Sequence, residues 1–237
     1  MSWILREGEP MFSYYGHRML GVIQSEEELA EVPTMAGQPV GTVRMDDIND
    51  DGVINNDDRV ILGNFMPDYY LGMVNEVNWR NFDLSIVIQA SIGGKKYNLE
   101  NLYYQGATTS ALLRSVVEGQ WWSPEEPGNG EHPAASLSVL QYIGSSDYYL
   151  EDATFLSVRN INLGYTLPTD LLDPFNVNNL RVYLSVTNPI MLTKDEFNGY
   201  NPEGQTNGIS GTTSYPGLNN GSEPLNRTIA FGINMNF

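Results

Sequence analysis

The chain has 237 residues, with 29 acidic against 12 basic side chains and a net charge of −17. Such a field repels nucleic acid, whose binding needs surfaces rich in Lys and Arg. Cysteine is absent, which excludes disulfides, thiolate metal sites and cysteine nucleophiles. The only two histidines, His17 and His132, leave few candidates for a histidine-based catalytic centre.

The composition favours strands over helices. The chain holds 14 Tyr, 4 Trp, 23 Gly and 13 Pro, which are typical of strands joined by turn-rich loops. No run of about 18 apolar residues exists, so no transmembrane helix is predicted. The first residues lack a basic region followed by an apolar stretch, so we expect no signal peptide there. The chain is then either cytoplasmic or an internal piece of a longer protein.

Residues 11–24 read as a first strand, aromatic at its start. A long connection at 25–68 follows. It opens on a helical turn at 25–30, with Ser25 as N-cap and Glu28 completing a capping box. We expect His17 to be packed or interfacial.

An acidic loop occupies residues 47–58 of this connection. Oxygen-bearing side chains fall at positions 1, 3, 5, 9 and 12, with Gly52 at position 6, which is the spacing of a calcium loop of EF-hand type. A hard cation takes oxygen ligands, and position 7 supplies a backbone carbonyl. The alternative is an acidic surface turn, and the departure from the pattern is an Asp where Glu is usual at position 12. The predicted ligands of a structural Ca²⁺ ion are Asp47, Asn49, Asp51, Val53, Asn55 and Asp58.

The clearest hairpin spans residues 71–92 and turns at Arg80 and Asn81. Its second arm is apolar at every other residue from Phe82 to Ile92, with Asp, Ser and Gln on the opposite face. A strand that crosses a bilayer obliquely needs about 9–11 residues, and a polar face suits a water-filled or plugged lumen.

A second long connection at 93–149 is unusually long for a compact soluble domain. It includes a predicted short helix near 110–118. Aromatic pairs within it are candidate contacts for a sugar ring or a lid protein; the alternative is a self-packed loop or an interfacial aromatic girdle. The candidates are Tyr103, Tyr104, Trp121 and Trp122.

The remaining strands are predicted at 154–166, with a bulge near Arg159 and Asn160, at 180–187 and at 229–237. A third long connection covers 189–223. Long and short connections alternate, as in outer-membrane barrels with long extracellular loops and short periplasmic turns. We therefore expect an all-β fold, an antiparallel meander of about six long strands from a transmembrane β-barrel.

Several separated motifs resemble one family. Residues 43–63 read VRMDDINDDGVINNDDRVILG, residues 82–85 FDLS and residues 156–165 LSVRNINLGY; Gly93, Gly94 and the terminal Phe237 fit too. They closely resemble a signature near the C-terminus of the SusC/RagA family of TonB-linked outer-membrane transporters. The resemblance spans almost the whole chain.

This resemblance implies that residues 1–237 are the C-terminal segment of a barrel in the cell outer membrane. Such importers take up glycans, other oligosaccharides or peptides with a SusD-like surface lipoprotein as lid. The plug and the segment that contacts the TonB complex would lie in a missing N-terminal part. Six strands cannot close a barrel, since the smallest has about eight.

Catalysis finds little support. The carboxylate pairs Glu125/Glu126 and Asp195/Glu196 are sequence neighbours in loops, without the histidine or glycine-rich context of acid–base chemistry. We expect no enzyme. The alternative function is a soluble, calcium-stabilised β protein that binds a glycan or a protein partner, although a dockerin would carry a second copy of the acidic loop.

Overall fold

The computed structural model describes residues 2–106, 113–195, 197–204 and 217–237. The chain divides into two compact units. The sheet unit consists of Pro67–Gly94, Asp152–Gly204 and Ser222–Phe237. The loop unit consists of Met1–Met66, Lys95–Glu151 and Gln205–Gly221. Among the described residues, no helix is long and apolar enough to cross a membrane.

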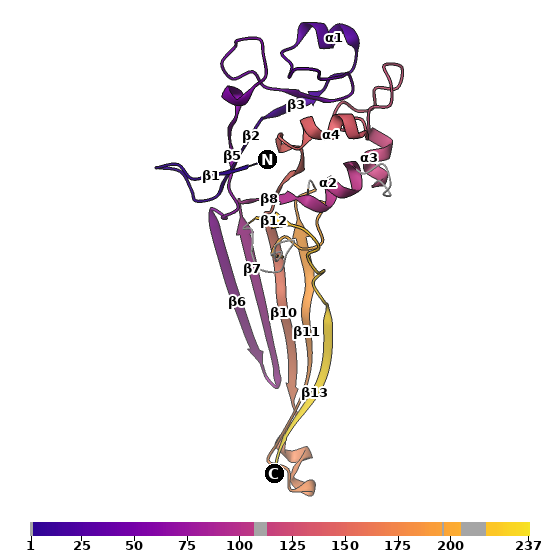
Figure 1. Cartoon of the computed structure of the whole chain (residues 1–237). Coiled ribbons are helices and arrows are strands. Elements are labelled where there is room, and N and C mark those ends of the chain that lie inside the picture. The colour runs from indigo at the N-terminus through magenta and orange to yellow at the C-terminus, as the bar shows by residue number, and fades with distance from the viewer. Residues whose placement is uncertain (1, 107–112, 196, 205–216) are drawn as a thin grey trace. The chain divides into compact units, whose positions relative to one another are not determined.

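The sheet unit is one antiparallel sheet of five long strands, in the order β13-β11-β10-β7-β6 (Figure 1). Every strand pairs with its neighbour in sequence within the sheet, so the topology is a meander. The strands are β6 Tyr69–Trp79, β7 Phe82–Ile92, β10 Phe155–Thr166, β11 Asn179–Thr193 and β13 Thr228–Asn236.

The predicted strands and turns of this sheet are confirmed. Trp79 pairs with Phe82 across the turn at 80–81. The register shifts between Val158 and Asn160 in both pairings of β10, which is the predicted bulge. The connection between β10 and β11 contains two short 3-10 helices, η3 Thr169–Leu171 and η4 Asp173–Phe175. β11 runs to Thr193, so the third connection begins after 193 and not at the predicted residue 189.

One expected strand does not join this sheet. Residues 11–24 form two short strands, β2 Ser13–Gly16 and β3 Met19–Val22, and both belong to the loop unit. The two strands are separated at His17, whose backbone N–H and carbonyl form hydrogen bonds with residues 145 and 147. The long antiparallel sheet therefore has five strands where about six were expected.

The three long connections, predicted as irregular loops, supply most of the loop unit. Its sheets are small: β1 Ser2–Ile4 with β2 and β5 Val60–Gly63; β3 with β4 Val43–Met45; and β12 Leu218–Asn219 with β8 Lys95–Asn98 and β9 Leu150–Asp152. Its helices are α1 Glu26–Glu31, α2 Leu99–Gly106, α3 Arg114–Gly119 and α4 Leu137–Ile143, with 3-10 turns η1 Asn56–Asp58 and η2 Asp147–Tyr149.

The loop unit has a hydrophobic core of its own, to which all three connections contribute. Tyr14 is fully buried in it, and its hydroxyl donates to the carbonyl oxygens of Gly217, at 2.8 Å, and Lys95, at 3.1 Å. Burial raises the pKa of Tyr14, and burial raises the pKa of Tyr97 to about 12. The core consists of Tyr14, Val43, Met45, Ile54, Leu62, Tyr97, Val139, Tyr142, Ile143, Tyr149 and Leu218.

The predicted N-cap of the first helical turn is confirmed at α1. The Ser25 hydroxyl accepts from the backbone N–H of Glu28 at 3.2 Å. The Glu28 carboxylate accepts from the N–H of Gln24, one residue before the cap, at 2.8 Å. The Ser25 bond satisfies a donor that a helix start otherwise leaves unpaired, but the predicted capping box is not formed, because Glu28 bonds to Gln24 and not to the N–H of Ser25.

Candidate functional site

The long sheet has one apolar and one polar face. A row of cross-strand partners runs Val77, Leu84, Leu163, Leu184, Phe231 from β6 to β13, so it is apolar on every strand. The rows beside it hold Trp79, Phe82, Tyr165, Val182 and Ile233 on one side, and Asn75, Ile86, Ile161, Val186 and Ile229 on the other. Many of these side chains are exposed, which soluble proteins avoid over a contiguous area.

The opposite face is polar. One row of cross-strand partners there runs Glu76, Ser85, Asn162, Ser185, Ala230, and the row beside it runs Asn78, Asp83, Gly164, Tyr183, Gly232. Successive residues of a strand point to opposite faces, and on β10 the parity of the apolar residues changes at the bulge between Val158 and Asn160. The sheet therefore separates an apolar from a polar environment.

An ion pair crosses the polar face. The Arg181 guanidinium on β11 donates to the Asp83 carboxylate on β7, with Nε to Oδ1 at 2.9 Å and Nη2 to Oδ2 at 2.5 Å. Nη2 also donates to Asn162 Oδ1 at 3.3 Å. This fork geometry is the strongest arrangement of an Arg–carboxylate pair.

Two glycines make room for large side chains on this face. A Cβ at Gly164 would lie 2.4 Å from both Arg181 Nη2 and Asp83 Oδ1. A Cβ at Gly232 would lie 2.3 Å from the Tyr183 ring. The Arg181 side chain therefore passes over the strand between its own and that of Asp83 only because β10 has no side chain there.

The bulge on β10 supports a second cluster. The Arg159 Nε donates to Gln89 Oε1 at 2.9 Å, and its guanidinium pairs with the Glu203 carboxylate. Asn160 donates to Ser185 Oγ at 3.2 Å. Together with the Arg181 pair, these contacts tie β7, β10 and β11 through their polar side.

The acidic loop is closed by its own side chains. Asp47 accepts from the N–H groups of Gly52, at 2.8 Å, and Asp51, at 3.3 Å. Asp51 accepts from the N–H of Val53 at 2.9 Å, and Asn55 from that of Asp57 at 2.8 Å. Asp50 and Gly52 adopt left-handed backbone conformations, with φ of 56° and 82°. The expected sharp turn at Gly52 is present.

Asp58 closes the loop from inside. Its two oxygens accept from the N–H groups of Ile48, at 3.1 Å, and Asn55, at 2.8 Å. The side chain is fully buried, and no Lys, Arg or His forms an ion pair with it in the described part of the chain. A buried carboxylate without a counter-charge is costly. His17, itself buried, lies with Nε2 2.7 Å from the carbonyl oxygen of Asn55.

The loop matches a hard cation in donor type, since all six predicted ligands offer oxygen. Within the described ranges, no group of three or more His, Cys, Asp or Glu side chains is arranged to hold a metal ion. Three of the six predicted ligands are such side chains, those of Asp47, Asp51 and Asp58; the others are two amides and the Val53 carbonyl.

The predicted aromatic contacts fall in different surroundings. Trp121 packs on Gly41, where a Cβ would lie 2.4 Å from its ring, and its Nε1 donates to Gln24 O at 3.1 Å. Trp122 is 57% exposed. Tyr103 and Tyr104 lie on α2, but their side chains are outside the described residues.

Sequence reasoning did not single out Arg181, Gly164 or the Asn55 contact of His17. Arg181 and Asp83 each lie at a polar position of an alternating strand, and the local sequence gives no other sign of a contact between them. The pairing of Arg181 with Asp83 depends on the register of three strands, which no local pattern fixes.

No protein-family model matches the chain. Two TonB-dependent receptors of Formosa agariphila are 32% and 31% identical to it over 237 and 240 residues, covering 99% of this chain and 23% of each receptor. The TonB-dependent receptor SusC of Bacteroides thetaiotaomicron is 28% identical over 170 residues, covering 70% of this chain and 16% of SusC. The chain thus spans about a quarter of the length of the Formosa relatives.

The structure of the RagAB peptide transporter matches with a TM-score of 0.67 at 16% identity, covering 98% of this chain and 24% of that chain. The same importer in its open-open state matches with a TM-score of 0.62 over the whole chain and 24% of that chain. The fold is therefore that of part of a large transporter. The resemblance to the SusC/RagA family of TonB-dependent receptors is confirmed: the chain is homologous to a segment of such receptors.

Proposed function

We propose that the chain is the C-terminal barrel segment of a TonB-dependent importer in the outer membrane. The observation that supports this most is the two-faced sheet, apolar on five successive strands and polar on the other side. In a barrel wall the apolar face meets lipid and the polar face lines the lumen. The alternative, a soluble β protein, would leave the apolar face in water.

The same proposal gives the two outer strands their partners. β6 and β13 each pair on one side only within the described residues. Unpaired backbone groups are not tolerated in hydrocarbon, so both edges would continue into strands of a longer chain. The long connections would then be extracellular, and the turn at 80–81 and the medium connection at 167–178 periplasmic.

The substrate and partners belong to the proposal as well. The importer would take up glycans or other oligomeric nutrients, peptides included, with a SusD-like lipoprotein on the extracellular side. TonB would act through a part of the protein outside this chain. The similarity to the TonB-dependent receptor SusC and to the RagAB peptide transporter supports this part of the proposal. Nothing in the site calls for catalysis, so the role proposed is transport.

We also propose that residues 47–58 bind a structural Ca²⁺. The buried Asp58 carboxylate supports it, together with five further oxygen donors in a loop already closed on itself. The ion would supply the positive charge that the loop lacks. The residues themselves hold the turn shut and, through His17 and Asn55, join it to the segment at 145–147.

The transport proposal is tested on the full-length protein in its native cell. Removing the gene should abolish growth on one oligomeric nutrient, and the protein should fractionate with the outer membrane. A matched pair of variants tests the aromatic contacts. Trp122→Ala should weaken substrate or lipoprotein binding without loss of folding, whereas Trp121→Ala should destabilise the loop unit. A protein found in the soluble fraction would contradict the transport proposal.

A further inference from the structure

We propose that Arg80, with the aromatic rings beside it, binds the phosphate of a phospholipid headgroup at the turn end of the long sheet. The inference rests on the proposed function, because it takes the apolar face of the sheet as the lipid-facing one.

Three aromatic side chains form a continuous cluster at this end of the apolar face. Trp79 stacks on Phe82 with ring centroids 6.3 Å apart and 19° between the planes. Phe82 meets Tyr165 on the next strand at 4.6 Å. Trp and Tyr are enriched where a membrane meets water, because their rings are amphipathic. The cluster therefore marks the level of the headgroups.

Arg80 is the cation of this cluster. It occupies the hairpin turn in a left-handed conformation, with φ of 54°, and its guanidinium carbon lies 5.0 Å from the centroid of the Trp79 ring. Within the described part of the chain it forms no ion pair, although acidic residues outnumber basic ones by 29 to 12. In the same unit Arg159, Arg181 and Lys194 are paired with carboxylates, whereas Arg227, like Arg80, has no ion pair among the described residues.

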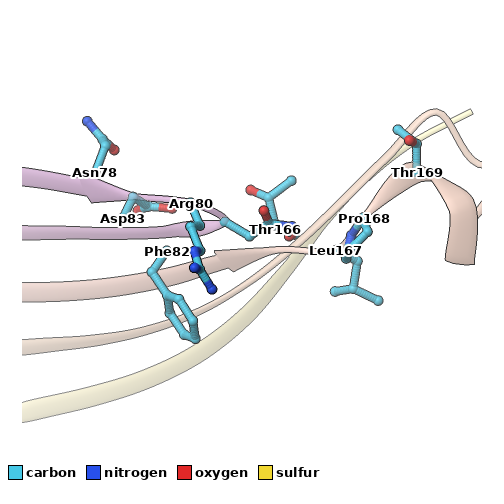
Figure 2. Close-up of a pocket in the computed structure, with 9 residues that line it drawn as sticks. Asn78, Arg80, Phe82, Asp83, Thr166, Leu167, Pro168 and Thr169 are labelled. Carbon is cyan, nitrogen blue, oxygen red and sulfur yellow. Dashed lines mark hydrogen bonds between the residues drawn. The ribbon is translucent and has the colours of Figure 1, made fainter.

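The surroundings of Arg80 form a pocket of about 340 Å³ (Figure 2). Arg80 and Phe82 project from the same side of the hairpin, and Asn78 from the other (Figure 2). The Asn81 amide donates to Thr166 O at 2.8 Å, which holds the hairpin against β10. The carboxylate in the lining, Asp83, is already engaged by Arg181, so it does not neutralise Arg80.

A phosphodiester on a lipid fits this arrangement in three ways. A guanidinium offers paired donors that match phosphate oxygens. The stem of a long basic side chain lies along apolar surface while its head reaches the interface. Acyl chains would continue along the apolar rows that begin at Trp79 and Phe82. A free phosphate could bind the guanidinium in the same way, but it has no acyl chain to pack on those apolar rows.

The test uses the full-length receptor that contains this chain, purified from membranes and reconstituted in nanodiscs with phosphatidylglycerol. Native mass spectrometry after detergent release measures the lipid that stays bound. Arg80→Gln should retain about fivefold less lipid, the factor that one basic residue near a membrane surface supplies. Arg80→Lys should restore part of it. The matched control is Arg227→Gln, which removes another exposed arginine of the sheet unit that has no ion pair among the described residues.

Equal lipid retention by wild type and Arg80→Gln would overturn the inference, and so would an equal loss in Arg227→Gln. A second arm adds inorganic phosphate to the receptor that has retained lipid. Phosphate binding that depends on Arg80 and displaces the lipid at equal concentration would identify a free-phosphate site instead. Heat-modifiable gel mobility reports barrel folding separately. A receptor that never forms a barrel contradicts the proposed function, whereas a folded receptor with unchanged lipid contradicts only the role of Arg80.

Discussion

Arg181 on β11 reaches across β10 to Asp83 on β7, and it does so over Gly164, the residue that pairs with Asp83 in the register. One charge-assisted contact on the polar face thus links β11 to β7 across β10, between two residues that are 98 positions apart in the chain. The side chains of Arg181 and Asp83 keep 26% and 34% of their exposure, so the pair is partly solvated and salt will screen it.

This ion pair gives the first prediction. In the full-length protein, Asp83→Asn and Arg181→Gln should each lower the free energy of unfolding. A double-mutant cycle should give a coupling of about 1 kcal/mol, as for other partly exposed pairs, falling as salt is added. Urea unfolding of the four proteins measures it. A coupling of zero at low salt would show that the pair does not stabilise the sheet.

The glycine beneath the pair gives a second prediction. Gly164→Ala places a Cβ 2.4 Å from both ion-pair partners, so the pair must open. We expect a loss of about 1 kcal/mol in wild type and a much smaller loss when Arg181 is already Gln. Gly72→Ala on β6 is the control, because a Cβ there meets nothing within 4 Å. Equal effects at the two glycines would point to strand propensity alone.

The two faces of the sheet give a third prediction. Ser85 and Ile86 are neighbours near the middle of β7 that point to opposite faces. Ile86→Arg should destabilise the membrane-inserted protein by about 2–4 kcal/mol, the cost of a cation facing lipid near the midplane. Ser85→Arg, which faces the proposed lumen, should change stability by less than about 1 kcal/mol. Equal costs for the two substitutions would contradict the assignment of the faces.

The acidic loop gives a fourth prediction. Calorimetric titration with Ca²⁺ should show binding in the wild type and its loss in Asp51→Ala, which removes both the charge and the ligand oxygen. Asp50→Asn removes the same charge from a non-ligand position and tolerates the left-handed backbone there, so its binding should change little. Equal heats in all three proteins would exclude the calcium site.

The fifth prediction concerns pH and His132. Burial lowers the pKa of His132, while the Glu131 carboxylate acts against that shift. Its Nδ1 lies 2.8 Å from the Tyr148 hydroxyl. Because the folded state then binds fewer protons than the unfolded state, the contribution is complete above the unfolded pKa of about 6.5 and is lost as the pH falls below it.

Hydrogen exchange of residues 114–149 checks this pH dependence. Protection should fall between roughly pH 8 and roughly pH 5.5 in wild type, and should fall less in His132→Gln. An unchanged pH response in the variant would show that other groups are responsible.

The strands of the long sheet could be predicted because their side chains alternate over many residues, as from Phe82 to Ile92. The bulge at Arg159 and Asn160 could be predicted because the apolar residues change from even to odd positions there. The folding of the long connections into a unit was not predictable, since its core joins residues as distant as Tyr14 and Gly217. Residues 11–24 were assigned to the wrong sheet for the same reason. Their apolar pattern fits any buried strand, and only long-range packing places them in the loop unit.

Cysteine scanning of β7 in the intact outer membrane would show which face of the sheet meets lipid and which meets water. The chain contains no cysteine, so every label within it comes from an introduced residue. Labelling should follow a period of two along the strand. A water-soluble maleimide should label cysteines at Asp83, Ser85, Val87 and Gln89, and should leave those at Leu84, Ile86 and Ile88 unmodified. Equal labelling of both sets would contradict a sheet with one face in lipid and the other in a lumen.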